Sequence, residues 1–199
     1  MEHPLISVLI PAYNHERYVE DTVLSVWEQK YPNLEIVLID DGSSDKTFEA
    51  ATALERRSPV PMQVLRQENR GINRTLNRAL KLSRGVFVAV IASDDKFAPE
   101  RFDSQVAMFM QRPDMQVVYG TARFWSEDKG LGERAHNEQI QSLLKQDAMA
   151  VLTYLYTHVP LLLTQTCLFK RSMLEAIGGW DEKLLLDDWP LNIRIFQHL

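Results

Sequence analysis

Two adjacent carboxylates, Asp94 and Asp95, follow an apolar run at residues 86–91. An unbroken apolar run of this kind is typical of a buried strand. In open α/β sheets, ligands bind in the crevice beyond the carboxyl ends of the strands. Carboxylates in that crevice could hold a hard divalent cation that meets a phosphate. Considered alone, the pair is explained more simply as a cap for the turn before Pro99.

Three further segments have residue types suited to a nucleoside diphosphate. Tyr13 could stack on a base, and Asp41 could accept hydrogen bonds from a base N–H or from ribose hydroxyls. Each of these residues also has a structural explanation, because Asp-Gly turns and serine helix caps occur in proteins that bind nothing, and Tyr13 could cover a sheet end. Their coincidence favours a nucleotide site. The four segments are residues 11–14, 40–43, 69–71 and 93–95, three of which directly follow predicted strands.

The elements that would position these residues alternate along the first part of the chain. Strands are predicted at residues 6–10, 35–39, 62–65, 86–91 and 115–119. Helical patterns separate them, at residues 16–30 and after Asp45, Gly71 and Pro99. Such alternation predicts an α/β fold with a mostly parallel central sheet and helices on both faces. Pro11 is predicted to end the first strand, because proline cannot continue a central strand.

The second part of the chain has less regular patterns. Residues 123–138 are polar, contain two glycines, and are interpreted as a loop or irregular strands. Residues 139–156 predict one helix that ends before Pro160. Two strands, a short helix, a sharp turn at Gly178-Gly179 and a final helix are then expected. Their ranges are residues 161–163, 166–169, 171–177, 178–179 and 189–199.

Composition limits the possible functions. The chain has 199 residues, 45% of them hydrophobic, which predicts a single domain over residues 1–199. Its last helix ends on an apolar stripe with no cap, so we expect a C-terminal truncation. A net charge of −5 argues against a nucleic-acid partner. The five histidines lack metal-ligand spacing.

Cellular location is also constrained by the sequence. The only cysteine, Cys167, lies in an apolar run and fits a buried position in a reducing compartment. No apolar run approaches the roughly 20 residues of a membrane helix, so no membrane span is predicted. We expect a cytoplasmic protein, either free or peripheral at the inner face of the membrane.

Five strings in order along the chain resemble the family 2 glycosyltransferases, which have the glycosyltransferase A fold. The resemblance implies a metal-dependent, inverting enzyme that moves a sugar from a nucleotide-diphosphate donor to an acceptor hydroxyl. The expected donor is a UDP-sugar, the acceptor is an unidentified carbohydrate, lipid or protein, and the process is polysaccharide or glycoconjugate synthesis. The strings are ISVLIPAYN (6–14), VLIDDGSSD (37–45), SDD (93–95), GGWDE (178–182) and DDW (187–189).

The resemblance also implies roles for individual residues. Asp95 matches the ligand of Mg²⁺ or Mn²⁺, and Asp188 matches the catalytic base. Many members of the family have a third aspartate where this chain has Ala92, which leaves fewer carboxylates for the metal. The expected nucleotide-binding residues are Pro11, Tyr13, Asp41 and Asp94, with Tyr13 and Asp41 at the base and Asp94 on the ribose side.

The sequence pattern also suggests three alternative functions. A dinucleotide-dependent oxidoreductase would have a glycine-rich loop after the first strand, where this chain has Pro-Ala-Tyr-Asn. A nucleotidyltransferase would also use strand-end carboxylates and a metal, but normally with an early glycine-rich, basic loop. A nucleotide-sugar-binding module without catalysis is the third. Asp187 or Asp188 could also be a plain helix cap before Trp189-Pro190, and for Asp188 this role is compatible with catalysis.

Overall fold

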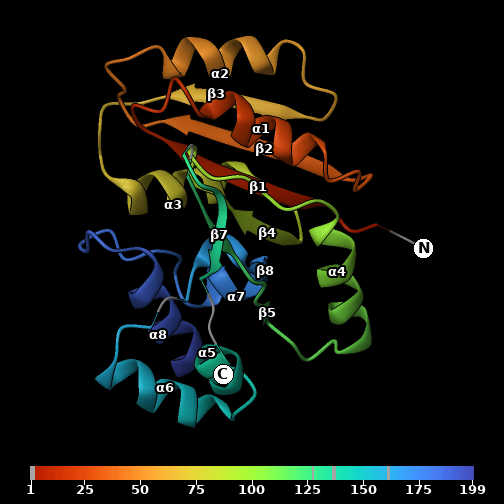
Figure 1. The fold of residues 1–199 in the computed structure, drawn as a ribbon, viewed down its shortest axis with the longest axis vertical. Coiled ribbons are helices and arrows are strands. Elements are labelled where there is room, and N and C mark those ends of the chain that lie inside the picture. The colour runs from red at the N-terminus through yellow and green to blue at the C-terminus, as the bar shows by residue number, and fades with distance from the viewer. Residues whose placement is uncertain (1–2, 127, 136–137, 161) are drawn as a thin grey trace.

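The computed structural model describes residues 3–126, 128–135, 138–160 and 162–199. These residues form a six-stranded sheet in the order β3-β2-β1-β4-β8-β5 and a separate two-stranded hairpin (Figure 1). The sheet strands are β1 (Ile6–Ala12), β2 (Leu34–Asp40), β3 (Met62–Arg66), β4 (Phe87–Val90), β5 (Val117–Val118) and β8 (Leu168–Lys170).

The sheet is mostly parallel, as predicted. β1 pairs in parallel with β2 and β4, and β2 pairs in parallel with β3. β8 is antiparallel to both of its neighbours, β4 and β5. The right-handed crossovers that link parallel strands need helices on the faces of the sheet. Those helices are α1 (Val19–Trp27), α2 (Thr47–Glu55), α3 (Ile72–Leu82) and α4 (Arg101–Gln111).

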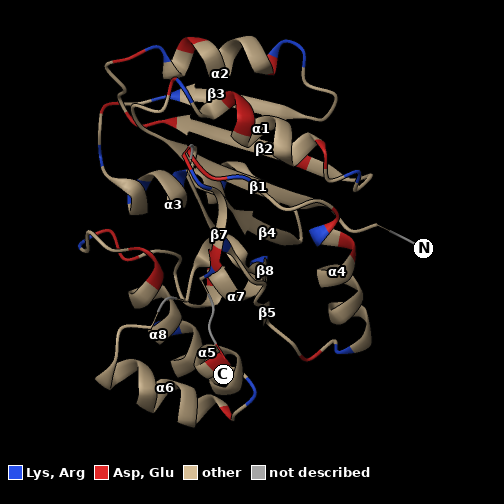
Figure 2. Ribbon diagram, in the orientation of Figure 1, with Lys and Arg blue, Asp and Glu red and all other residues tan. Residues whose placement is uncertain are grey.

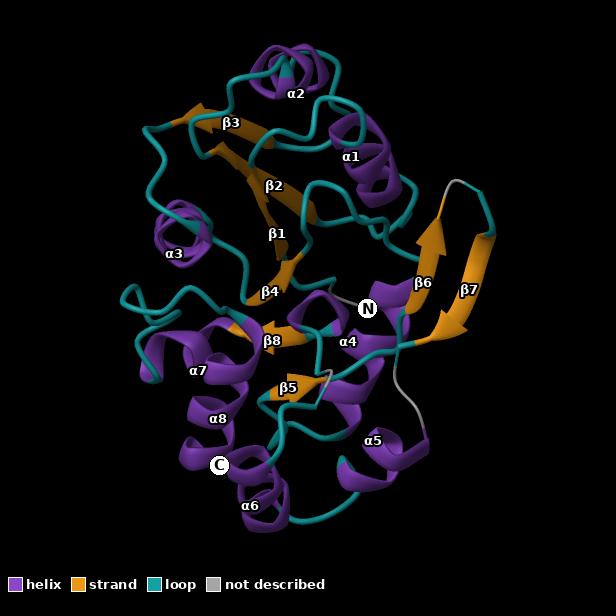
Figure 3. Cartoon of the chain, turned by 60° about the vertical axis from the view of Figure 1, so that its left-hand side comes forward, coloured by secondary structure: helices purple, strands orange, loops and turns teal. Residues whose placement is uncertain are grey.

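Helices cover both faces of the sheet (Figure 3). On one face, Ile6, Val8 and Ile10 of β1 pack in a core shared with α1, α2 and α4. On the other face, Leu9 packs in a core shared with α3, α7 (Arg171–Ala176) and α8 (Asp188–His198). This alternation follows from the two-residue period of a strand. Both sides of the central strands are therefore buried, which explains their nearly continuous apolar sequence.

The first strand continues through Pro11, contrary to the prediction that proline would end it. Pro11 pairs with Ile39 of β2, and β1 ends at Ala12. On the other side, the Leu9 carbonyl accepts a hydrogen bond from the Ile91 N–H at 3.1 Å. Alternate residues of a strand face the same neighbour, so Pro11 faces the β4 side beyond the end of that strand. The missing N–H therefore removes no ladder hydrogen bond.

The second part of the chain differs more from the predictions. The single helix expected at residues 139–156 is two helices, α5 (Glu138–Leu143) and α6 (Ala148–Thr157). The second begins at a new cap, because the Asp147 carboxylate accepts from the Ala150 N–H at 2.9 Å. Residues 123–138 contain an antiparallel hairpin of β6 (Arg123–Ser126) and β7 (Gly130–Arg134) with an irregular register.

The segment before β8 also departs from the prediction. Of the strand expected at residues 161–163, residue 161 lies outside the described residues, and Leu162 and Leu163 are not in a strand. They lead into a 3₁₀ turn, η1 (Thr164–Thr166), and the strand expected at 166–169 is β8, two residues later at its start. Gly178 and Gly179 have φ values of 76° and 70°, which confirms the predicted turn. Within the described residues, no helix combines the length and the hydrophobicity needed to cross a bilayer.

Candidate active site

The predicted nucleotide and metal residues lie along one edge of the sheet. β2, β1 and β4 are adjacent and parallel, with Ala12 opposite Asp40 and Leu9 opposite Val90. The loops that follow these strands therefore emerge at the same edge, where α/β proteins bind ligands. Those loops carry the predicted site residues Tyr13, Asp41, Asp94 and Asp95, and Pro11 is the second-to-last residue of β1.

Asp41 has a structural role that the sequence did not predict. Its Oδ1 accepts from Gln67 Nε2 at 2.7 Å and from the Arg70 N–H at 2.9 Å. Its Oδ2 accepts from the Gly71 N–H at 2.9 Å. The side chain is buried and joins the end of β2 to the loop that starts α3. Because a carboxylate offers about four acceptor positions, Oδ2 can still accept from a ligand.

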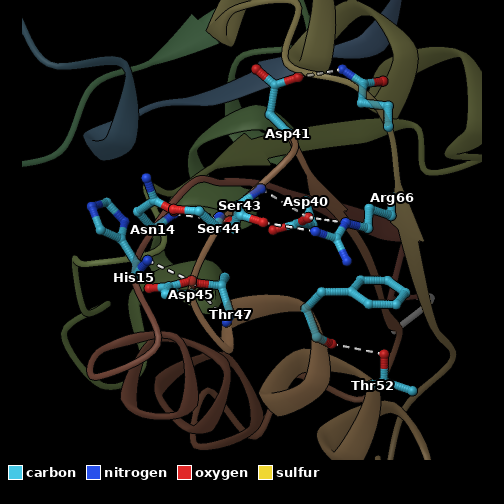
Figure 4. Close-up of polar contacts among 12 residues, drawn as sticks. Asn14, His15, Asp40, Asp41, Ser43, Ser44, Asp45, Thr47, Thr52 and Arg66 are labelled. Atoms are coloured by element: carbon cyan, nitrogen blue, oxygen red, sulfur yellow. Dashed lines mark hydrogen bonds and ion pairs between the residues drawn. The ribbon is translucent and has the colours of Figure 1, made fainter.

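The neighbouring Asp40 fixes the loop that follows β2. It is fully buried, and its Oδ2 accepts from the Ser43 N–H at 3.2 Å and lies 3.2 Å from Arg66 Nε (Figure 4). Gly42 lies between the two aspartates with a φ of 78°. A Cβ at Gly42 would come within 2.8 Å of the Asn69 N atom. The Asp-Asp-Gly string is therefore required by the backbone of this loop as well as by any ligand.

The loops after β1 and β2 are hydrogen-bonded to one another. Asn14 Oδ1 accepts from the Ser44 N–H at 2.8 Å, and the Asn14 N–H donates to Ser43 Oγ at 2.9 Å (Figure 4). Asn14 has a φ of 55°, a conformation that asparagine tolerates better than most residues. Tyr13, one residue earlier, is 48% exposed. The loop is thus fixed while the tyrosine ring faces solvent, where a base could stack on it.

His15 connects the first loop to the third, a contact that the sequence analysis missed. Its Nδ1 lies 2.7 Å from Ser93 Oγ, and its Nε2 lies 3.6 Å from Asp94 Oδ2. Metal-ligand spacing, the feature by which histidines are recognised in a sequence, does not reveal this contact. The available signal was the position of His15 directly after the candidate segment at residues 11–14.

Asp94 and Asp95 have the electrostatics of a cation site. Partial desolvation, then the adjacent Asp94, raises the pKa of Asp95, and His15 opposes the shift. The Thr22 hydroxyl donates to the Asp95 carbonyl at 2.8 Å, which ties the loop to α1. A carboxylate whose charge is disfavoured by burial and by a neighbouring carboxylate fits a divalent cation, because the cation offsets both effects. No cluster of three metal-ligating side chains occurs in the described residues.

Asp188 is the first residue of α8, at a start that is visibly acidic (Figure 2). Its Oδ1 accepts from the Thr164 N–H at 2.9 Å and also from the Thr164 hydroxyl. Burial, then Asp187, raises the pKa of Asp188 to about 6, and the charge of Asp95 adds to the increase. The carboxylates of Asp188 and Asp95 thus interact electrostatically, although they come from distant segments of the chain. A pKa near the working pH is what general-base catalysis requires.

The alternative of Asp188 as a simple helix cap is not supported by the described contacts. Asp187 occupies the cap position of α8 and makes no side-chain capping hydrogen bond within the described residues. The Asp188 carboxylate accepts from a different segment, η1. Trp189, the next residue, donates its Nε1–H to the Leu155 carbonyl at 3.0 Å and anchors the start of α8 to α6.

The family model for glycosyl transferase family 2 matches residues 7–178. The chain belongs to this family. Among curated relatives, the putative teichuronic acid biosynthesis glycosyltransferase TuaG of Bacillus subtilis is 37% identical over 109 residues, which cover 55% of this chain and 43% of TuaG. The chain spans about half the length of the curated relatives it matches.

Two solved structures establish the fold. Residues 1–349 of S. aureus TarS, in complex with UDP-GlcNAc, match with a TM-score of 0.71 and 22% identity, covering 96% of this chain and 53% of that one. The mannosyltransferase PcManGT of Pyrobaculum calidifontis, in complex with GDP-Man and Mn²⁺, matches with a TM-score of 0.69 and 22% identity, covering 95% and 51%. The family 2 chain therefore has the glycosyltransferase A fold expected from its sequence.

Proposed function

We propose that this chain is the catalytic domain of an inverting glycosyltransferase that uses a nucleotide-diphosphate sugar. The observation that carries the proposal is the position of Asp188, held by Thr164 within electrostatic reach of Asp95. A base and a metal-binding loop are thereby brought together. The names of the relatives support a role in polysaccharide or glycoconjugate synthesis, and the bound ligand of TarS supports a UDP-sugar as donor.

The nucleotide would lie along the strand ends. The base would stack on the exposed ring of Tyr13 and donate to Asp41 Oδ2, which accepts one protein hydrogen bond in the described contacts. Pro11 would form the floor beneath the base, because it lies two residues before Tyr13 at the end of β1. Asp94 would face the ribose hydroxyls, with His15 fixing its loop.

Mg²⁺ or Mn²⁺ would be held by Asp95. When bound, such a cation neutralises the negative charge that develops on the departing nucleoside diphosphate. Desolvation and Asp94 raise the pKa of Asp95, and a bound cation would stabilise the charged form of this carboxylate. Ala92 supplies no carboxylate, so the affinity for the metal should depend on the donor's phosphates.

Asp188 would remove the proton from the acceptor hydroxyl. Its Oδ1 is held by two donors from Thr164, which leaves Oδ2 to accept the proton. The acceptor oxygen then bonds to the anomeric carbon as the diphosphate leaves from the opposite face, and this geometry inverts the configuration. Since the pKa of Asp188 is about 6, the carboxylate is mainly ionised at neutral pH.

The β6–β7 hairpin would lie on the acceptor side. Trp125 of β6 is 55% exposed, and Lys96 Nζ lies 5.2 Å from the centre of its ring. Because Lys96 directly follows Asp95, this contact brings an exposed indole close to the metal-binding loop. An exposed aromatic ring beside a sugar-transfer site is suited to packing against the apolar face of an acceptor sugar.

Incubation of the full-length protein with a panel of nucleotide sugars and Mn²⁺ tests this function. Release of a nucleoside diphosphate together with a glycosylated acceptor is the expected result. Pyrophosphate release would instead indicate a nucleotidyltransferase, and binding without turnover of any donor would indicate a binding module. Cell fractionation of the same protein tests its proposed cytoplasmic location, free or at the inner face of the membrane.

A further inference from the structure

We propose that Thr164 is the positioning residue of the catalytic base, holding Asp188 Oδ1 so that Oδ2 alone receives the acceptor proton. Two donors of one residue converge on one oxygen: the Thr164 N–H, at 2.9 Å, and the Thr164 hydroxyl. The inference rests on the proposed function, in which Asp188 is the base. It assigns a role to a residue that lies between the two strands predicted from the sequence, at residues 161–163 and 166–169.

The turn that carries Thr164 is rigidly held. Thr164 is fully buried, and its carbonyl accepts from the Cys167 N–H at 2.9 Å, which closes η1. The Arg101 guanidinium donates to the carbonyls of Gln165 and Cys167 at 2.6 and 2.9 Å. Directly after the turn, β8 pairs with β4. The hydroxyl of Thr164 is therefore fixed relative to the sheet that carries the metal-binding loop.

The helix that carries Asp188 is fixed to the same segment. Asn192, one turn further along α8, donates to the Asp188 carbonyl at 2.8 Å and to the Leu162 carbonyl at 2.9 Å. Its Oδ1 accepts from the Tyr119 hydroxyl. Burial holds the pKa of Tyr119 well above its usual value, so this phenol remains a donor at working pH. Base and positioning residue thus belong to one buried network.

Hydrogen bonds to a carboxylate stabilise its charged form and lower its pKa. The groups that act on Asp188 are Asp187 on its own helix, Asp95 from the β4 loop, and Thr164 from η1. Both aspartates raise the pKa of Asp188, and the two Thr164 donors oppose them. The Tyr119 hydroxyl and the Cys167 thiol are close enough for Asp188 to influence their pKa values. Removal of the Thr164 hydroxyl should therefore raise the pKa of the base and free its carboxylate to rotate.

Thr164→Val in the full-length protein tests the inference, because it keeps the shape and the backbone N–H but removes the hydroxyl. We expect kcat to fall about 10- to 100-fold, the size of one hydrogen bond to a charged group, with the KM for the donor unchanged. The acid limb of the pH–kcat profile should move to higher pH. Thr164→Ser, which keeps a hydroxyl, should restore most of the rate and the original limb.

The matched control is Thr166→Val in the same turn. The Thr166 hydroxyl donates to the Leu163 carbonyl at 2.7 Å, and its described contacts do not include Asp188. This variant should leave the pH profile unmoved. If Thr164→Val does not fold, Thr164→Ala removes the same hydroxyl with less steric demand, and its pH profile is measured instead.

Two outcomes overturn the inference. The first is an unmoved acid limb in the variants that lack the hydroxyl. The second is a decrease in kcat that is the same at every pH and that Thr164→Ser does not restore. That result would mean that Thr164 has a purely structural role. A wrong assignment of Asp188 as the base would give a different result, because the Asp188→Asn variant would then retain transfer activity. If Asp188→Asn lost transfer activity while Thr164→Val kept the kcat and pH profile of the unmodified protein, only the role of Thr164 would be overturned.

Discussion

Asp95 and Asp188 interact electrostatically across the site: the negative charge of Asp95 contributes to a pKa of about 6 for Asp188. A raised pKa means that Asp188 is protonated, and inactive as a base, below about pH 6. The acid limb of kcat/KM should therefore fall near pH 6, with transfer increasing above it. In the metal-free protein, Asp95→Asn should lower the pKa of Asp188, because it removes a like charge. A carboxyl ¹³C NMR titration checks both statements, and an Asp188 that titrates near its usual value would contradict them.

Asp188→Asn should separate catalysis from stability. Asparagine keeps an oxygen that can accept from Thr164 but cannot act as the base, so transfer should fall on the order of 10²- to 10⁴-fold. The same change removes a partly buried charge that Asp187 and Asp95 disfavour, so thermal stability at neutral pH should not fall. Asp187→Asn is the matched control, since it changes the adjacent charge and leaves the base. Near-normal transfer by the Asp188 variant at saturating donor would remove the assigned base.

The order of strands and helices could be predicted from the sequence because buried strands and amphipathic helices have different periods. What could not be predicted was set by tertiary contacts. Pro11 continues a central strand only because β4 ends before it. Asp147 is a good cap residue and could have indicated the break between α5 and α6, but the apolar pattern continues across it.

The site shows the same division between local signals and tertiary contacts. Its strand-end carboxylates could be recognised because they follow apolar runs directly. The partners of those carboxylates could not, since Thr164 lies 24 positions from Asp188 and His15 lies 78 positions from Ser93. The capping of the α3 loop by Asp41 likewise depends on how β2 and the segment after β3 come together.

Tyr13 and Asp41 should respond differently to substitution. Tyr13→Ala should weaken UDP binding with little change in melting temperature, because the ring is half exposed. Asp41→Ala should weaken binding and also destabilise the fold by about 1–3 kcal/mol, because the partly buried hydrogen bonds from Gln67, Arg70 and Gly71 are lost. Isothermal titration calorimetry and thermal unfolding of both variants provide the check. An unchanged dissociation constant in Asp41→Ala would show that the base lies elsewhere.

Substitution of Trp125 should weaken acceptor binding and leave donor binding unchanged. Trp125→Ala removes an exposed ring from the β6–β7 hairpin, so the KM for the acceptor should increase several-fold while UDP affinity stays constant. Phe124→Ala is the matched control, because Phe124 is the adjacent residue of β6 and is similarly exposed. Equal effects of the two substitutions on acceptor KM would mean that the hairpin has no specific acceptor contact at Trp125.

The protein alone should bind Mn²⁺ weakly, and an added carboxylate should increase its affinity for the metal. With Asp95 as the main ligand and Ala92 contributing no carboxylate, Mn²⁺ should bind poorly without nucleotide and much better with UDP present. Asp95→Asn should abolish this coupling between Mn²⁺ and UDP. Ala92→Asp adds a carboxylate to the same loop, where the Ala92 carbonyl already accepts from the Asp95 N–H at 3.1 Å, and should tighten Mn²⁺ binding about tenfold. Calorimetry with Mn²⁺ alone, with UDP alone and with both measures each effect. Tight Mn²⁺ binding by the unmodified protein without nucleotide would contradict a site that the donor's phosphates complete.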